Sequence, residues 1–274
     1  MKLAYEANAW GGVIGTPSAV TDLTTGFYLT PGQIEPTLEA IAAAGFAGVE
    51  LFDGNLLPFE SDATAFRSAL ARSGLSLTGV YSGGHFIYRD AHDDEFARFE
   101  RSIALAAASG ARHYVMGGGA IRSAGRRDDD FRVMAELLDR VADQARAAGL
   151  VPSYHPHLGS LVETGEHLEA LLSESSIELC ADVAHLAAGG SDPAAIIRRY
   201  ADRLAYVHLK DADLADGGFL PLGAGDVDLA GVVTALRETG YDDWITVELD
   251  GYTGDLAAAA ATSRAFLVHH GLAD

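Results

Sequence analysis

The stretch LAYVHLKDADLADGGFLPLGAGDVDLAGVVTALRETGYDDWITVELD, residues 204–250, contains the pattern that decides the fold. It opens with an apolar run typical of a buried β-strand, 204–210, and it closes with a second such run, 244–250. Between them, LAGVVTALRETG at 229–240 has the apolar spacing of a helix. Because two parallel strands need a crossover connection, this strand–helix–strand unit predicts a parallel pair.

The same alternation of strand and helix continues along the whole chain. Further apolar runs predict strands at 2–8, 48–52, 75–82, 112–117, 150–155 and 177–183. Alanine-rich segments with apolar residues at helical spacing follow these runs and predict helices. Eight such units favour closure of the sheet, so we expect an α/β fold, a (β/α)8 TIM barrel that forms a single domain over residues 1–274.

An open, doubly wound sheet is the alternative fold. Such a sheet would carry a glycine-rich nucleotide-binding turn after its first strand. The run GGVIG at 11–15 fits that fingerprint poorly and is not followed at once by a helix. A second glycine run, Gly117–Gly119, leads into a polar loop, and we interpret it as a flexible connection at the rim of the barrel.

Composition and charge limit the partners of the chain. The 274 residues carry a formal net charge of −20, which argues against nucleic acids and anionic membrane surfaces as partners. The amino terminus lacks the apolar segment of a secretory signal, and no run of about 18 apolar residues predicts a membrane span. We therefore expect a cytoplasmic protein. The single cysteine, Cys180, lies in the apolar run IELCADV and is interpreted as a core residue.

Polar residues concentrate where the predicted strands end, which is where active sites of TIM barrels lie. Four such runs carry acidic residues or histidines, namely LVET at 161–164, CADVAH at 180–185, HLKD at 208–211 and VELD at 247–250. An acidic residue at the end of an apolar strand is costly to bury unless it is paired or bound to a metal. The recurrence of this arrangement on successive strands predicts one metal site.

The stretches YHPHLGSLVET (154–164), CADVAHLAAGG (180–190) and PLGAGDVDLAG (221–231) resemble the xylose isomerase-like barrel superfamily of sugar isomerases and epimerases. They are most similar to its inosose dehydratase branch. The resemblance implies a divalent cation, with Mn²⁺ expected and Mg²⁺, Co²⁺ or Zn²⁺ as alternatives. It also implies a set of ligands, which are Glu163, Asp182, His208 and Glu248. Many members place a glutamate directly at the end of the fifth strand, where this chain has Tyr154 and His155. We therefore assign this role to Glu163 of the LVET run, with His155 as the substitute and His157 as a further candidate.

A cation with open coordination positions can polarise the carbonyl of a keto-sugar or ketoinositol and favour loss of the α proton. The resulting metal-bound enediolate leads to isomerisation, to epimerisation, or to dehydration by loss of a β-hydroxyl. In an epimerase, Glu163 and Glu248 would be the acid and base on opposite faces of the substrate. In a dehydratase, the leaving hydroxyl needs a proton donor, and the available catalytic groups are His155, His157 and Lys210.

Other residues at the strand ends are expected to bind the sugar or cyclitol substrate, and they are Glu6, Asn8, Trp10, Glu50, His85 and His185. Arg122, Arg126 and Arg127 precede three aspartates and are interpreted as a solvated, self-paired loop. Two alternatives to an isomerase or dehydratase remain open at this point. One is a sugar-binding barrel that is not catalytic or needs a partner subunit, and the other is a hydrolase like the AP endonucleases, which the negative charge disfavours. A homo-oligomer is a further possibility.

Overall fold

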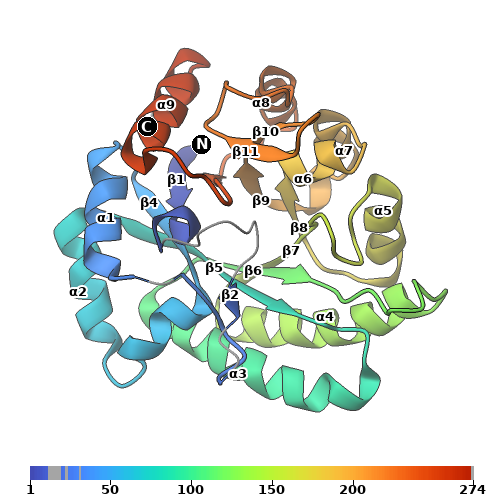
Figure 1. The fold of residues 1–274 in the computed structure, drawn as a ribbon. Helices are drawn as coiled ribbons and strands as arrows, with labels where there is room; N and C mark the ends of the chain where they lie inside the picture. The colour runs from blue at the N-terminus through green and yellow to red at the C-terminus, as the bar shows by residue number, and fades with distance from the viewer. Residues whose placement is uncertain (12–19, 22–23, 31, 273–274) are drawn as a thin grey trace.

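The computed structural model describes residues 1–11, 20–21, 24–30 and 32–272. Four residues of the GGVIG run and the side chain of Trp10 lie outside this description. Eight parallel strands form a closed barrel in the order β1-β12-β9-β8-β7-β6-β5-β4 (Figure 1). Their bounds are β1 (Lys2–Glu6), β4 (Gly48–Phe52), β5 (Ser76–Gly84), β6 (His113–Gly118), β7 (Val151–His155), β8 (Leu179–Asp182), β9 (Leu204–Leu209) and β12 (Trp244–Val247). The TIM barrel predicted from the sequence is therefore confirmed.

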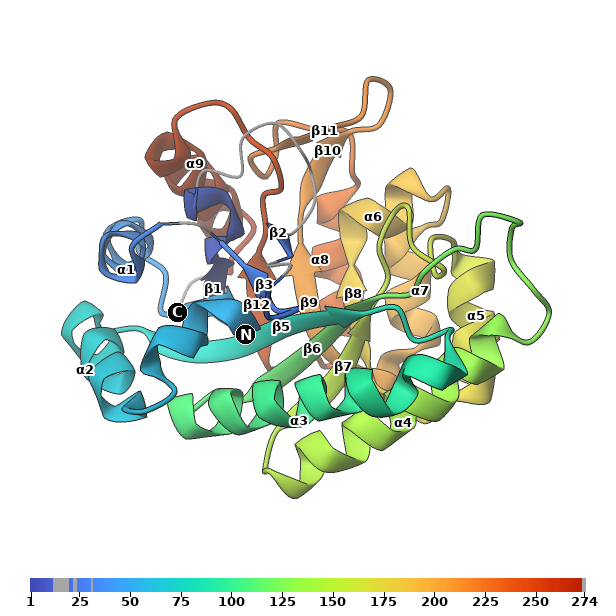
Figure 2. The same cartoon turned by 60° about the horizontal axis from the view of Figure 1, so that its bottom comes forward.

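Helices alternate with these strands and cover the outside of the barrel. Figure 2 shows α3 and α4 running beneath β5, β6 and β7. The α-helices are α1 (Ile34–Ala43), α2 (Ala63–Ser73), α3 (His92–Ser109), α4 (Asp130–Ala147), α5 (Gly165–Glu174), α6 (Val183–Ala188), α7 (Pro193–Arg199), α8 (Leu229–Glu238) and α9 (Leu256–His269). Short 3-10 helices are η1 (Ala7–Gly11), η2 (Asp53–Phe59), η3 (Arg89–Ala91) and η4 (Ala201–Arg203). No helix in the described ranges is both long enough and apolar enough to cross a lipid bilayer.

Two small hairpins and the short helix α6 were not predicted from the sequence. The hairpins are β2 (Val20–Thr21) with β3 (Tyr28–Leu29), and β10 (Asp211–Asp213) with β11 (Gly218–Leu220). The second hairpin lies between the strand predicted at 204–210 and the helix predicted at 229–240, in a segment for which no strand was predicted. Its base is fixed by the buried carboxylate of Asp211, which accepts backbone N–H groups of Gly223, Gly225 and Val227 at 2.9–3.2 Å.

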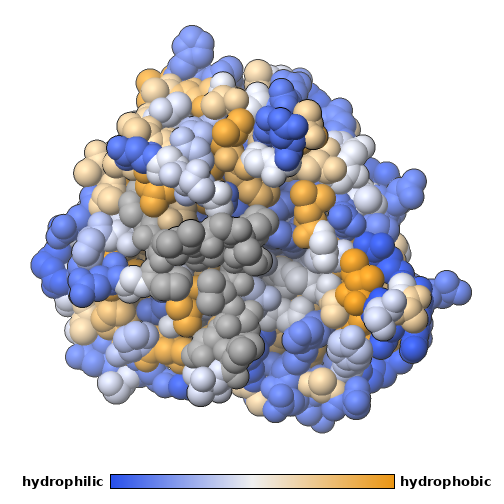
Figure 3. Space-filling view, in the orientation of Figure 1, coloured by the Kyte–Doolittle hydropathy of each residue, from blue (hydrophilic) through white to orange (hydrophobic). Residues whose placement is uncertain are grey.

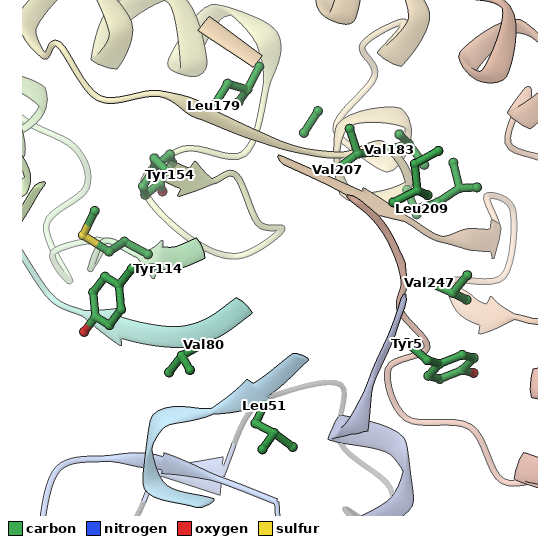
Figure 4. Packing of buried hydrophobic residues seen from close by; sticks show 14 of the residues in the cluster. Tyr5, Leu51, Val80, Tyr114, Tyr154, Leu179, Val183, Val207, Leu209 and Val247 are labelled. Carbon is green, nitrogen blue, oxygen red and sulfur yellow. The ribbon is translucent and has the colours of Figure 1, made fainter. Parts of the chain in front are cut away.

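The core has two layers, because successive side chains of a strand point to opposite faces. Figure 4 shows residues such as Tyr5, Val80 and Leu179 pointing outward from the barrel strands, where they meet the helices. A smaller cluster, which includes Cys180 and Tyr206, fills the barrel itself. Cys180 is fully buried there, as expected of a core residue.

Candidate active site

Four buried side chains meet at the carboxyl end of adjacent strands. His155 ends β7, Asp182 ends β8, His208 lies in β9, and Glu248 directly follows β12. Each offers one ligand atom, and these atoms all lie within 4.8 Å of one another. We call these four residues the metal cluster. The neighbouring order of their strands, β12-β9-β8-β7, is what brings together residues far apart in the sequence.

The chemistry of this cluster fits a divalent cation. Asp182 Oδ2, His208 Nδ1 and Glu248 Oε2 are buried and make no well-oriented hydrogen bond within the described residues, although the two carboxylate oxygens lie 3.2 and 2.9 Å from the ammonium of Lys210. Buried polar atoms of native proteins normally have a partner, so such a concentration of exceptions points to a ligand. Burial, and after it the proximity of His208, holds the pKa of His155 well below its usual value. His155 is therefore neutral, which is the state in which an imidazole binds a metal.

The expectation that Glu163 supplies the fifth-strand ligand does not fit this geometry. The loop after β7 turns back on itself, with the N–H of His157 donating to the carbonyl of Val162 at 3.1 Å. Glu163 consequently accepts from the N–H of Gly159 at 3.2 Å and from Arg126 at 3.4 Å, and its side chain is 33% exposed. The substitute residue, His155, takes the place in the cluster.

Glu50 was expected to bind the substrate. It instead lies fully buried behind the metal cluster. Its Oε2 is 2.9 Å from Nε2 of His208. Since a carboxylate only accepts, this contact places a proton of His208 on Nε2, while Nδ1 lies 2.8 Å from Glu248 Oε2. Burial lowers the pKa of His208, but neighbouring groups that include Glu50 and Glu248 hold it well above its usual value. A cation bound at Nδ1 would replace the proton on that nitrogen. Carboxylate partners of this kind fix the tautomer and the ring orientation of metal-binding histidines.

Glu6, also expected to bind substrate, is buried beneath the same site. Neither of its oxygens has a hydrogen-bond partner, and Oε2 lies 3.9 Å from Nδ1 of His208. Burial, and after it the negative charges of Glu248 and Glu50, raise the pKa of Glu6 well above its usual value. Glu6 therefore contributes to the electrostatics of the site from below.

A second polar group, centred on Lys210, adjoins the metal cluster. Lys210 Nζ donates to Asp250 Oδ2 at 2.8 Å and lies 3.0 Å from Nε2 of His185. It also lies 2.9 Å from Glu248 Oε2 and 3.2 Å from Asp182 Oδ2. Burial alone would lower the pKa of Lys210, but the three carboxylates hold it well above its usual value. Lys210 is therefore a buried, charged ammonium that contacts two members of the metal cluster.

Asn8 and two histidines complete this second group. Asn8 Nδ2 donates to Asp250 Oδ1 at 2.7 Å and to Glu248 Oε1 at 3.3 Å. The rings of His157 and His185 lie 3.7 Å apart, centre to centre. Burial lowers the pKa of His185 to about 4, and it lowers the pKa of His157 as well. Both imidazoles are therefore neutral near pH 7.

A cleft of about 770 Å³ opens onto the two groups, and Glu248, Asp250, His155 and His157 line it. Its opposite wall carries three aromatic rings that the sequence did not single out, Tyr28, Phe52 and Tyr81, with centroids 5.5–6.2 Å apart. Tyr81 also meets the ring of His155 at 5.5 Å. These aromatics belong to apolar strand ends, where a sequence pattern does not distinguish them from core residues.

Two more features define the rim of the site. His85, expected to bind substrate, lines the outer part of the cleft with its side chain 73% exposed. Phe219 of the β10–β11 hairpin lies 4.8 Å from Lys210 Nζ and 5.3 Å from the ring of His185. Phe219 was not predicted from the sequence, because its position depends on a hairpin that the pattern did not reveal.

The buried carboxylates and imidazoles lie at the carboxyl end of a parallel barrel, which is where the active sites of TIM-barrel enzymes are found. The family described as "Xylose isomerase-like TIM barrel" matches residues 38–269, and the chain belongs to this family. The resemblance inferred from the sequence motifs is thus confirmed.

Named relatives place the chain more closely. It is 30% identical over 250 residues to the rhizopine catabolism protein MocC of Rhizobium meliloti, covering 79% of this chain and 74% of that protein. It is 28% identical over 288 residues to an inosose dehydratase of Geobacillus kaustophilus, covering 90% and 91%. Among solved structures, an L-ribulose 3-epimerase shares the fold with a TM-score of 0.77 at 22% identity, over 98% of this chain and 94% of that one. The IolI protein, solved with a zinc atom, has a TM-score of 0.76 at 18% identity, over 98% of both chains.

Proposed function

We propose that this protein is a divalent-cation-dependent dehydratase of a keto-sugar or keto-cyclitol. It would remove the proton α to the carbonyl and then eliminate a β-hydroxyl as water. The observation that carries the proposal is the metal cluster with the charged Lys210 beside it, at the base of a cleft. The inosose dehydratases among the relatives support the same chemistry.

His155, Asp182, His208 and Glu248 would hold the cation. Two imidazoles and two carboxylates suit several divalent ions, and we propose Mn²⁺. When bound, the cation would polarise the substrate carbonyl and stabilise negative charge on its oxygen. Glu50 would hold a proton of His208 on Nε2 and so keep Nδ1 oriented toward the ion.

His157 is the proposed proton acceptor. It lines the cleft, and burial keeps it neutral. Its Nδ1 lies 2.7 Å from the carbonyl oxygen of Leu158 and therefore donates to it, which leaves the lone pair of Nε2 available. A neutral imidazole within reach of the substrate is a suitable general base near pH 7.

Lys210 is the proposed source of the proton for the leaving hydroxyl, because a cation held by Asp182 and Glu248 would offset the negative charges that raise the pKa of Lys210 and would make its ammonium a better acid. It is fully buried, so it would act through Asp250, which accepts its hydrogen bond at 2.8 Å and lines the cleft. Asn8 holds the other oxygen of Asp250 and so fixes the direction of this carboxylate. Elimination requires such a donor, because hydroxide is a poor leaving group.

Epimerisation is the second candidate, favoured by the fold shared with an L-ribulose 3-epimerase. The acid–base pair expected for it, Glu163 and Glu248, is not supported by the geometry, since Glu163 is paired with Arg126 outside the cluster. Dehydration is for this reason the preferred reaction.

Products from ketoinositols and keto-sugars would distinguish the reactions. With Mn²⁺ present, dehydration gives an enone that absorbs in the ultraviolet, whereas epimerisation gives a stereoisomer without new absorbance. An enone at a rate that scales with enzyme concentration supports the dehydratase. A stereoisomer as the sole product would reject it in favour of the epimerase.

A further inference from the structure

We infer that the cleft contains a second binding region without a free cationic group, across from the metal cluster, and that the substrate is an unphosphorylated keto-glycoside. In such a substrate the keto-sugar ring carries a second ring or a similar group in glycosidic linkage. The inference rests on the proposed function, because the reacting ring is taken to lie at the metal cluster.

The size of the cleft favours a substrate larger than a single sugar ring. Its volume is about 770 Å³. Pockets of roughly 300–1,000 Å³ enclose drug-sized ligands, and a single six-membered sugar ring is much smaller than such a ligand. A lone keto-sugar would therefore leave much of this cleft to water.

The additional space lies on the side of the cleft opposite the metal cluster. It is lined by small residues at the ends of β5 and β6, Gly83, Gly84, Gly118 and Gly119, and by Ala91 at the start of α3. In the strand order of the barrel, β5 is diametrically opposite β9, and β6 is opposite β12. The small residues thus lie across the cleft from His208 and Glu248. A ring held at the metal cluster would direct its substituent toward them.

Charge excludes a phosphate from this second region. Arg98 is the sole arginine or lysine among the described residues that line the cleft. Its guanidinium already donates to Ser82 Oγ at 3.0 Å, to Asp53 Oδ2 at 3.4 Å and to the carbonyl of Gly83. Asp94 and Glu95, in the first turn of α3, add negative charge at the rim. Anion sites use free cationic groups or unopposed helix N-termini, and neither is present here.

The arginines near the rim provide no alternative phosphate site. Arg122 is paired with Asp130 at 3.1 Å, and Arg126 is paired with Glu163 at 3.4 Å. Arg122 is therefore paired within its own loop, as the sequence indicated, whereas Arg126 pairs with Glu163 outside that loop. The outer edge of the face shown in Figure 3 is mainly hydrophilic, with scattered hydrophobic residues nearer its centre.

The groups that do line the region suit a neutral sugar or aryl ring. Tyr28, Phe52 and Tyr81 offer aromatic surface for the apolar face of a ring. Asp94 is exposed and can accept hydrogen bonds from hydroxyl groups, as can the exposed His85. Burial raises the pKa of Tyr81 well above its usual value, so its phenol stays neutral.

Three probes with the same reacting ring test the inference on the wild-type enzyme loaded with Mn²⁺. They are 4-keto-glucose, phenyl 4-keto-β-glucoside and 4-keto-glucose 1-phosphate, which all keep the hydroxyl at C2 in the position β to the carbonyl, and each is followed by exchange of the α proton in D₂O. We expect kcat/KM to be about tenfold or more higher for the phenyl glycoside than for the free sugar, and lowest for the phosphate. Equal values, or the highest value for the phosphate, would overturn this inference alone. No exchange with any probe would overturn the proposed function itself.

A matched pair of variants on α3 and the turn before it locates the effect. Ala91→Phe fills the second region, whereas Ala104→Phe adds the same ring on the exposed outer face of α3. We expect Ala91→Phe to reduce kcat/KM for the phenyl glycoside about tenfold and to change that for the free sugar less than about twofold. Ala104→Phe should change neither value. Unchanged glycoside kinetics in Ala91→Phe would contradict the inference, and the comparison of probes on wild type stands even if this variant does not fold.

Discussion

The two walls of the cleft are built from different kinds of residue. The wall formed by β7, β8, β9 and β12 carries buried charges, including Asp182, Lys210 and Glu248. The wall formed by β3, β4, β5 and β6 carries aromatic rings and glycines, including Tyr28, Tyr81 and Gly83. Buried charges are costly and persist where they act on a ligand, whereas aromatic rings and glycines provide shape. On the proposed function, the first wall would carry the reaction and the second would select the substrate.

The largest effect should come from a ligand of the charged wall. Asp182→Asn removes a carboxylate from the metal cluster and should reduce kcat/KM by roughly a thousandfold, which is about 4 kcal/mol of transition-state stabilisation. Binding of Mn²⁺, measured by isothermal titration calorimetry, should also be lost. Asp202→Asn, an exposed substitution in η4, is the control and should alter neither quantity. Full Mn²⁺ affinity in Asp182→Asn would refute the ligand assignment.

A second substitution on the same wall distinguishes removal of the α proton from loss of the hydroxyl. Lys210→Met keeps the length of the side chain but removes the proton source, so enone formation should fall about 10²–10⁴-fold. Exchange of the α proton in D₂O, which depends on His157, should fall much less. Circular dichroism would check the fold, because Asp250 loses its cationic partner. Parallel losses of exchange and elimination would show that Lys210 does not act in elimination alone.

Glu50 tests the support behind the charged wall. Glu50→Gln can no longer fix the proton of His208 on Nε2, so Mn²⁺ affinity should fall about 10–100-fold. Nitrogen NMR of the histidine side chains would report the protonation of both ring nitrogens directly. In the wild-type apoprotein, where carboxylates face both ring nitrogens of His208, we expect a doubly protonated ring, and in the variant a lower pKa for it, because Glu50 helps to raise this pKa. An unchanged titration of His208 together with unchanged affinity would exclude this role.

The aromatic wall should affect binding and not the reaction. Phe52→Leu removes one ring of the wall, which should raise KM by up to about tenfold, since aromatic contacts contribute on the order of 0.5–1.5 kcal/mol. The value of kcat should stay within about twofold, because Phe52 does not touch the charged groups. A fall in kcat with constant KM would break the proposed division between the walls.

Glu163 belongs to neither wall and should show the smallest effect. Glu163→Gln should leave Mn²⁺ affinity and kcat/KM within about twofold of wild type, because the carboxylate is partly exposed and makes a surface ion pair. Inductively coupled plasma mass spectrometry of the purified variant checks metal content. Loss of bound metal would restore the original sequence-based assignment of Glu163.

The same contrast explains what the sequence could and could not predict. Asp182, His208 and Glu248 could be identified as candidates from the sequence because an ionisable residue interrupts an apolar strand. The alternation of strands and helices predicted the barrel. Tyr28, Phe52 and Tyr81 were not visible, because aromatic residues at strand ends are equally typical of the core. Glu163 was misplaced since the direction of a loop side chain depends on how the loop folds, here on the contact between His157 and Val162.

Glu50 illustrates a further limit of the sequence. Its position at a strand end correctly predicted that it lies near the site, but the pattern did not reveal on which side of His208 it lies. That side decides whether a carboxylate meets the substrate or supports a ligand. Three-dimensional contacts were required to distinguish these roles.

We propose that the charged wall activates the proton α to a carbonyl with the help of a bound cation. The direct test is proton NMR of a ketoinositol or keto-sugar in D₂O with the metal-free enzyme, before and after addition of Mn²⁺. We predict no exchange without the cation and rapid deuterium incorporation at the α carbon once it is added. Equal exchange in both samples, or none in either, would contradict the account.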